Sequence, residues 1–366
     1  MTEERCLENY NALHKTFLQV VRLGIGTSND AKVPDDVDWV QLKALADVQG
    51  LSAVVFDGLN QVLKSNPQFS FFNARLKLSW IGEVVQNYEQ RYSKYENVIG
   101  SLAGWYNAHG YKMMVLKGYA CSIDWPKPEH RPCGDIDIWL FGKQKETDRL
   151  LTSDMGINVD NSHHHHTVFD WQGVTIENHY DFINVYHHKS HVRLEKVLKE
   201  LGMDDSHYLE IDGTRIYLPS PNLHALFLLK HAALHFVGTE LTFRQILDWA
   251  FFVQKHGKDV DWNILLPVID EHGMTPFLNI IDAICVKDLG FDASLFPMIL
   301  CNHDLKDRVL TEIFASMYEY DKELNIIKRY RRWRDNAWKH ELCYKESMWS
   351  AFWCGVWGHL LKPASI

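Results

Sequence analysis

The chain has 366 residues, 46% of them hydrophobic and 23% charged, which excludes a disordered protein and suffices for one large or two to three ordinary domains. The formal net charge of −9 argues against a protein that coats nucleic acid by bulk charge. The seven scattered cysteines form no C-x-x-C pair, so they exclude a zinc ribbon and favour a reducing, cytoplasmic location.

The first hundred residues are predicted to be helical. Apolar residues recur at helical spacing from Trp39 to about Leu63, and again at steps of three and four from Trp80 to Leu102. Gly110 follows the second run and is a residue type that commonly ends helices. We therefore expect an N-terminal helical region over residues 1–105.

The hydrophobic period then changes to that of strands. Short strands are predicted over residues 111–118 (YKMMVLKG), 135–141 (DIDIWLF) and 174–182 (VTIENHYDF), with residues 215–219 (RIYLP) as a candidate fourth. Residues 106–219 should form a small mixed sheet. From Ser220 the helical period returns, which predicts a C-terminal helical domain over residues 220–366. The expected fold class is α+β and mostly helical.

The end of the chain is rich in basic and aromatic residues. The run over residues 328–338 favours a solvated basic helix face; an RNA-binding surface and, last, a membrane-surface helix are the alternatives. Residues 348–361 (MWSAFWCGVWGHLL) are apolar but fewer than the roughly 20 residues that span a bilayer. We expect a buried or interfacial helix and no stable membrane insertion.

The chemistry is predicted to lie at a D-x-D motif. Alternate side chains of a strand share a face, so Asp135 and Asp137 point the same way. Two like charges at that spacing repel, and a divalent cation such as Mg²⁺ or Mn²⁺ is the usual way to offset them. Glu177 is the expected third carboxylate, and it alternates with His179 on one face of the next predicted strand. Alone, such a motif is more often a solvated edge.

Residues around this motif suit the binding of phosphate. Gly134 allows a close approach of backbone or phosphate, and the Arg131 guanidinium has a fork that matches phosphate oxygens. Lys117 and Gly118 end a predicted strand and begin a segment that turns into a helix, where backbone N–H groups can receive a phosphate. The order of these features is typical of metal-assisted phosphoryl or nucleotidyl transfer.

With these features the sequence resembles the nucleotidyltransferase superfamily that has the DNA polymerase β type of fold, and within it the bacterial family of uncharacterised nucleotidyltransferases. The resemblance spans about residues 40 to 260. It rests on Leu-Lys-Gly at 116–118, Arg131, Gly-Asp-Ile-Asp at 134–137, Ile-Glu-Asn-His at 176–179, and the helical residues His231, His235 and 244–248 (RQILD). Lys117-Gly118 stands where the superfamily has Gly-Ser or Gly-Gly.

The resemblance implies transfer of a nucleoside monophosphate from a nucleoside triphosphate to an acceptor hydroxyl. The acceptor stays open among a small molecule, a protein and an RNA end. A non-catalytic module that binds a nucleotide or a partner is the alternative. A second rival is a metallohydrolase built on residues 163–166 (HHHH) and His179. For His231 and His235 we expect packing or substrate contact. Arg244 and Asp248 are spaced for a helix-surface ion pair or, if partly buried, for a brace of the C-terminal domain against the catalytic core.

Overall fold

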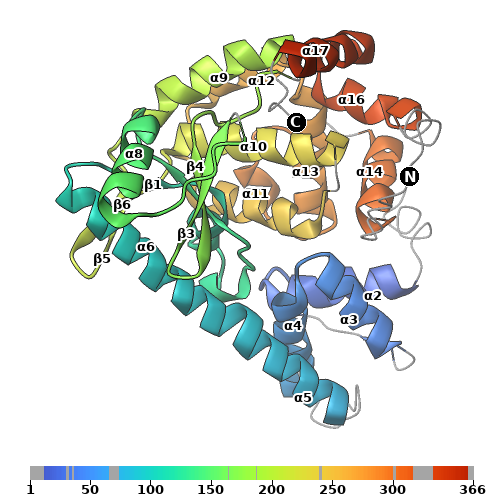
Figure 1. The fold of residues 1–366 in the computed structure, drawn as a ribbon. Coiled ribbons are helices and arrows are strands. Elements are labelled where there is room, and N and C mark those ends of the chain that lie inside the picture. The colour runs from blue at the N-terminus through green and yellow to red at the C-terminus, as the bar shows by residue number, and fades with distance from the viewer. Residues whose placement is uncertain are drawn as a thin grey trace.

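The computed structural model describes residues 12–29, 33–34, 37–65, 74–163, 165–186, 188–238, 241–299, 302–315 and 333–361. The protein is 64% helical and contains a six-stranded mixed sheet, which confirms the predicted mostly helical α+β class. The sheet lies on one side of the molecule, with the long helix α6 along it and the C-terminal helices packed beside it (Figure 1).

The strand order in the sheet is β3-β4-β2-β1-β6-β5. Two neighbouring pairs are parallel, β2 with β4 and β1 with β6, and the other pairs are antiparallel. Strands β1, β2 and β4 fall within predicted strand segments, β6 overlaps the predicted segment 215–219, and β3 and β5 were not predicted. The strands are β1 (Met114–Val115), β2 (Ile136–Trp139), β3 (His166–Trp171), β4 (Val174–His179), β5 (Tyr208–Ile211) and β6 (Thr214–Tyr217).

Helices precede the sheet, as the periodicity predicts. Asp38 begins α3 because its carboxylate accepts hydrogen bonds from the backbone N–H groups of Val40 and Gln41. Gly110 lies beyond the end of α6 with a φ of 80°, a conformation that glycine adopts without strain. These helices are α2 (Ala12–Gly24), α3 (Trp39–Val48), α4 (Ser52–Ser65), α5 (Ala74–Glu83), the π-helical turn η1 (Val84–Glu89) and α6 (Gln90–Ala108).

The remaining helices follow or interrupt the strands. A capping box between Thr242 and Gln245 begins α11. Among the described residues, no helix has the length and apolar character needed to cross a membrane. These helices are α7 (Lys117–Ser122), α8 (Gln144–Met155), α9 (Lys189–Gly202), α10 (Pro221–Gly238), α11 (Phe243–His256), α12 (Trp262–Glu271), α13 (Thr275–Lys287), α14 (His303–Ala315), α16 (Ala337–Cys343) and α17 (Met348–Leu361).

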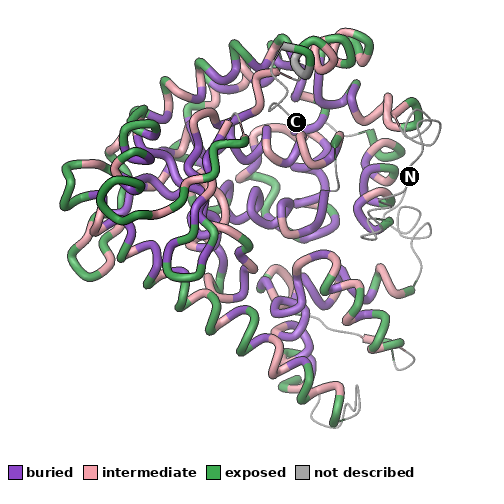
Figure 2. Tube along the Cα trace, in the orientation of Figure 1, coloured by how far each residue is buried: buried purple, intermediate pink, exposed green. Residues whose placement is uncertain are grey.

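Two hydrophobic cores lie on either side of the sheet. The smaller one joins α6 to the strands and includes Val98, Ile99, Ile136 and Ile138. The larger one joins the N-terminal helices to the C-terminal helices, and it fills the buried centre of the molecule in Figure 2. Helix α6 packs with the sheet through the smaller core, and the domain boundaries at 105 and 219 stay predictions.

The two cores show which way the side chains of the D-x-D motif point. Ile136 and Ile138 of β2 belong to the core beside α6, so Asp137 between them points to the opposite face, towards the C-terminal helices. The N-terminal helices are tied to that same side, since Gln49 donates to the carbonyl of Ile313. The carboxylate therefore lies where the sheet meets the larger helical core.

Candidate active site

Asp137 and Glu177 lie side by side on neighbouring strands. β2 and β4 run parallel, and their register pairs these two residues directly. The Asp137 side chain is 3% exposed and the Glu177 side chain 23% exposed. Two carboxylates on one face of adjacent strands concentrate negative charge in a largely buried place, which is unfavourable without a compensating cation.

His179 joins the two carboxylates. Its Nε2 lies 2.7 Å from Asp137 Oδ1 and 3.6 Å from Glu177 Oε2. Burial alone would lower the pKa of His179, but hydrogen bonds to Asp137 and Glu177 outweigh it and raise the pKa to about 9. The imidazole is therefore positively charged at neutral pH when no metal ion is bound.

Lys117 supplies a second positive charge. It begins α7, and its Nζ lies 2.7 Å from Asp137 Oδ1. Burial opposes ionisation of Asp137, yet Lys117 and His179 together hold the pKa of that carboxyl well below its usual range. Gly118 follows with a φ of 44°, and an added Cβ would lie 3.5 Å from the carbonyl oxygen of Asp135. The Lys-Gly turn thus passes directly beside the D-x-D motif.

Asp135 lies at the rim of this cluster, immediately before β2. It is half-buried, and burial together with the charges of Asp137 and Glu177 raises the pKa of its carboxyl. The neighbouring Gly134 is exposed, and its carbonyl accepts a hydrogen bond from the Tyr95 hydroxyl at 2.8 Å. Three carboxylates therefore face one lysine and one histidine, which leaves a negative excess.

The residues present fit a divalent cation. Asp137, Glu177 and His179 each offer one ligand atom, and these atoms lie within 4.8 Å of one another. Two carboxylates and an imidazole suit Mn²⁺, and the carboxylates also suit Mg²⁺, which prefers oxygen. The Lys117 ammonium bonded to Asp137 Oδ1 shows that this position accepts a positive charge. We call Asp135, Asp137, Glu177 and His179 the acidic cluster.

The histidine run lies next to the acidic cluster. His166 opens β3, its ring lies 5.5 Å from that of His179, and its Nε2 lies 4.0 Å from Glu177 Oε1. Burial lowers the pKa of His166 to about 4, so its imidazole is neutral. Among the described residues, the group whose ligand atoms lie close enough together to hold a metal ion is Asp137, Glu177 and His179. The described histidines of the run are not part of it. This geometry gives the metallohydrolase interpretation little support.

Arg131 is held by the C-terminal helices. Its Nε donates to Asp248 Oδ1 at 3.0 Å and its NH2 to Asp248 Oδ2 at 2.7 Å, while its NH1 donates to the carbonyl of Pro132. Both side chains are buried. The structure thus shows Arg131 in a bidentate brace to Asp248 of α11, and its predicted contact with the triphosphate stays a prediction. Asp248 is thus hydrogen-bonded to Arg131, whereas the helical spacing predicts Arg244 as its partner.

α10 brings two further histidines towards the cluster. The rings of His231 and His235 lie 4.5 Å apart, as their helical spacing predicts. Burial and the charge of Lys117 lower the pKa of His231 well below its usual range, so it is neutral. His231 thus adds a polar, uncharged side chain near Lys117.

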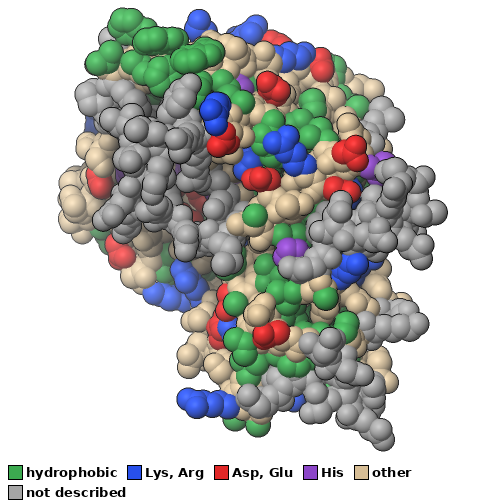
Figure 3. All heavy atoms as spheres, turned by 90° about the vertical axis from the view of Figure 1, so that its right-hand side faces the viewer, with side chains coloured by type: hydrophobic (Ala, Val, Ile, Leu, Met, Phe, Trp, Pro, Cys, Tyr) green, Lys and Arg blue, Asp and Glu red, His purple; other side chains and the backbone are tan. Residues whose placement is uncertain are grey.

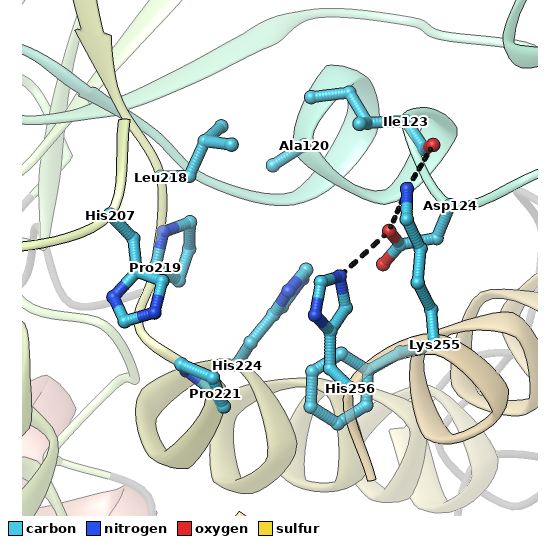
Figure 4. A pocket seen from close by; sticks show the side chains of 11 residues that line it. Ala120, Ile123, Asp124, His207, Leu218, Pro219, Pro221, His224, Lys255 and His256 are labelled. Carbon is cyan, nitrogen blue, oxygen red and sulfur yellow. Dashed lines mark hydrogen bonds and ion pairs between the residues drawn. The ribbon is translucent and has the colours of Figure 1, made fainter. Parts of the chain in front are cut away.

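A separate hollow lies at the far end of α7 (Figure 4). Its charges satisfy one another, because Asp124 Oδ1 lies 3.0 Å from His256 Nε2 and 3.2 Å from Lys255 Nζ. Burial lowers the pKa of His224 to about 4, so this imidazole adds no charge. The hollow lacks the uncompensated negative charge of the acidic cluster. Its other lining residues are Ala120, Ile123, His207, Leu218, Pro219, Pro221 and Phe252.

Comparison with known proteins points to one family. The family described as uncharacterised nucleotidyltransferase matches residues 35–288. Among solved structures, the chain is similar to an antigenic nucleotidyltransferase-like protein from Paracoccidioides brasiliensis, with 16% identity, 44% of this chain and 75% of that chain covered, and a TM-score of 0.32. That similarity is too low to inform the site. No curated protein matches the chain. The family match covers the acidic cluster, Lys117 and the Arg131–Asp248 brace.

Proposed function

The chain belongs to the family of uncharacterised nucleotidyltransferases, and on that premise we propose that it transfers a nucleoside monophosphate from a nucleoside triphosphate to an acceptor hydroxyl, releasing pyrophosphate. The observation that supports this most is the pairing of Asp137 with Glu177 on adjacent parallel strands, with His179 within ligand distance of both. The reaction would depend on Mg²⁺ or Mn²⁺.

The acidic cluster would hold the metal. Asp135, Asp137 and Glu177 carry more negative charge than Lys117 and His179 offset. When bound, a divalent ion supplies charge neutralisation at the triphosphate and makes the acceptor hydroxyl a better nucleophile. Glu177 is the proton acceptor we favour, because His179, 3.6 Å away, lowers its pKa and keeps the carboxylate ionised, whereas His179 already carries a proton in the metal-free protein.

Lys117 and the glycines would bind the triphosphate. A cation at Asp137 would displace the Lys117 ammonium, which is then free to contact phosphate oxygens. Gly118 lacks a Cβ where its backbone passes the carbonyl of Asp135, and space beside Gly134 is open, so phosphate can approach both. Arg131 would act indirectly, by fixing this turn against α11 through Asp248.

The non-catalytic module remains the second candidate, and one contact favours it. Lys117 already pairs with Asp137 at 2.7 Å, so the cluster has an internal cation and does not need a metal ion to fold. In that case the protein would bind a nucleotide without turning it over. The two functions differ in whether label from the α-phosphate leaves the nucleotide.

The test is a transfer assay with α-³²P-labelled nucleoside triphosphates, Mg²⁺ or Mn²⁺, and three acceptor pools: small hydroxyl compounds, protein and RNA. We expect label transfer and pyrophosphate release with one pool, lost in Asp137→Asn. Glu210→Gln is the matched control, because Glu210 is an exposed strand carboxylate in the same sheet. Nucleotide binding without transfer to any pool would instead establish the non-catalytic module.

A further inference from the structure

α17 exposes a stripe of large apolar side chains. Its members are between 44% and 68% exposed. They recur at steps of three and four, so they share one face of the helix. The helix carries no Asp, Glu, Lys or Arg. Figure 3 shows the apolar side chains gathered at the top of the molecule, where α17 lies. The aromatic stripe consists of Trp349, Phe352, Trp353, Trp357 and Leu360.

Cations lie beside the aromatic stripe. Glu346, just before α17, accepts hydrogen bonds from Ser190 at 3.0 Å and pairs with His188 at 2.8 Å, which holds the start of α9 against the start of α17. The exposed side chains of α9 include Lys189, Arg193 and Lys196. The acids that pair with Arg193 and Lys196 are themselves exposed, so these pairs are weak.

A further cation is attached through Trp333. The Trp333 ring lies 5.1 Å from that of Trp349 and 6.1 Å from that of Phe352. The next residue, Arg334, has a side chain that is 63% exposed; its pair with Asp335 at 3.1 Å is weak, because Asp335 is 64% exposed as well. The preceding basic residues 328–332 lie outside the described part of the chain. The described surface thus combines indole rings with cations at its border.

We propose that the aromatic stripe and its bordering cations bind the surface of an anionic lipid bilayer. Indole rings favour the headgroup level of a membrane, and cations near it are attracted to anionic lipid. With 14 residues, α17 is about 21 Å long at 1.5 Å per residue, so it lies in the interface and does not cross. The protein would carry its catalytic domain to the membrane surface.

The charges favour lipid over a second copy of the chain. In a twofold dimer the same patch meets itself, so Lys189, Arg193 and Arg334 would approach their own counterparts or leave the stripe partly uncovered. An anionic bilayer complements the cations and covers the whole stripe. Self-association is therefore a distinct outcome that the experiment separates.

The experiment is sedimentation of the full chain with vesicles of phosphatidylcholine alone or mixed 3:1 with phosphatidylglycerol. We expect binding to the anionic vesicles that weakens with added KCl. Trp349→Ser/Trp353→Ser/Trp357→Ser should reduce the partition coefficient by at least about tenfold, and Lys189→Gln/Arg193→Gln/Lys196→Gln by about tenfold. Val40→Ser/Leu78→Ser/Ile264→Ser is the matched control, because these exposed apolar residues lie on other helices.

A second readout guards against misfolded variants. Vesicles containing dibrominated lipid should quench the indole fluorescence of the wild type and of the control, and not that of the triple tryptophan variant. Equal sedimentation of wild type and the tryptophan variant would overturn the proposal. So would a tryptophan-dependent dimer in light scattering without vesicle binding, since that outcome assigns the stripe to a second copy.

Discussion

The Arg131–Asp248 brace and the acidic cluster are both buried and charged, yet they are built differently. The brace has one cation and one anion, joined by two hydrogen bonds that use both carboxylate oxygens. The acidic cluster has three carboxylates, and its cations, Lys117 and His179, both bond to the same oxygen of Asp137. In the brace the two charges balance and both carboxylate oxygens are hydrogen-bonded. In the acidic cluster, ligand atoms are left that can bind a metal ion.

This difference separates a structural ion pair from a site. A buried pair that loses one partner leaves an uncompensated charge, so it tolerates no change. In a cluster with excess negative charge, the repulsion between carboxylates destabilises the folded state until a cation binds. Such clusters are a feature of functional sites. Of the four variants below, three test whether the two regions respond as this contrast requires, and the remaining one tests another buried charged group, Glu195.

Loss of the brace should have the largest effect on folding. Asp248→Asn leaves the Arg131 guanidinium buried without a counter-ion, so we expect the free energy of unfolding to fall by about 3 to 5 kcal/mol. Urea denaturation measures it. Glu271→Gln, which breaks the exposed pair with Arg193, is the control and should cost at most about 1 kcal/mol. Equal losses in the two variants would contradict the brace.

Loss of Lys117 should affect chemistry more than folding. Lys117→Met removes the internal cation from Asp137, so metal should bind more tightly while nucleotidyl transfer falls by about 10² to 10³-fold. Calorimetric titration with Mn²⁺ and the label-transfer assay measure the two quantities. Weaker metal binding together with unchanged transfer would show that Lys117 belongs with the brace and not with the site.

Glu195 is another buried carboxyl group, and its raised pKa makes the stability of the protein depend on pH. Its carboxylate accepts hydrogen bonds from the backbone of Phe182 and Ile183, and burial raises its pKa to about 7 from an ordinary 4.5. The folded state therefore binds the proton more tightly, and stability is lost as pH rises from about 4.5 to 7, by about 1 to 3 kcal/mol. Glu195→Gln should remove this slope in urea denaturation at pH 5 and 7.5, whereas the exposed Glu200→Gln should keep it.

Asp135→Asn should give the smallest change in the free energy of unfolding without metal, and it should stabilise the protein where Asp248→Asn destabilises it. Because burial and the neighbouring carboxylates raise its pKa, its charge destabilises the folded state above about pH 4. Asp135→Asn should therefore raise the metal-free free energy of unfolding by about 0.5 kcal/mol and lose the stabilisation by Mn²⁺. A variant that is destabilised without metal would place Asp135 among residues that fold the protein.

The sequence predicts what depends on local spacing. The strand period of two places Ile136 and Ile138 on the face opposite Asp137, and the two cores confirm it. The parallel pairing of β2 with β4, which sets Asp137 beside Glu177, depends on contacts across the sheet and has no local signal. β3 was missed because its first residue is the last of a run of histidines, which shows no alternation of apolar and polar residues.

The brace shows the same limit. Asp248 and Arg244 have the spacing of a helical ion pair, so local rules pair them. In the folded chain Asp248 bonds with Arg131 instead, 117 residues away in sequence. No periodicity links positions so far apart, so the pairing of Asp248 with Arg131 could not be predicted. The contact of Arg131 with phosphate was predicted from its guanidinium fork and stays a prediction. The basic residues 328–332 lie outside the described chain, and the RNA-binding alternative for them stays a prediction.

The central claim is that the acidic cluster binds a metal ion together with a nucleoside triphosphate. The most direct measurement is the melting temperature of the wild type and of Asp135→Asn/Asp137→Asn against each of the four nucleoside triphosphates, with and without Mg²⁺. A ligand at 100 times its Kd stabilises the folded state by about 2.7 kcal/mol, so binding should be visible. We predict a Mg²⁺-dependent rise with at least one nucleotide in the wild type alone. An equal rise in both proteins, or none in a well-folded wild type, would contradict the claim.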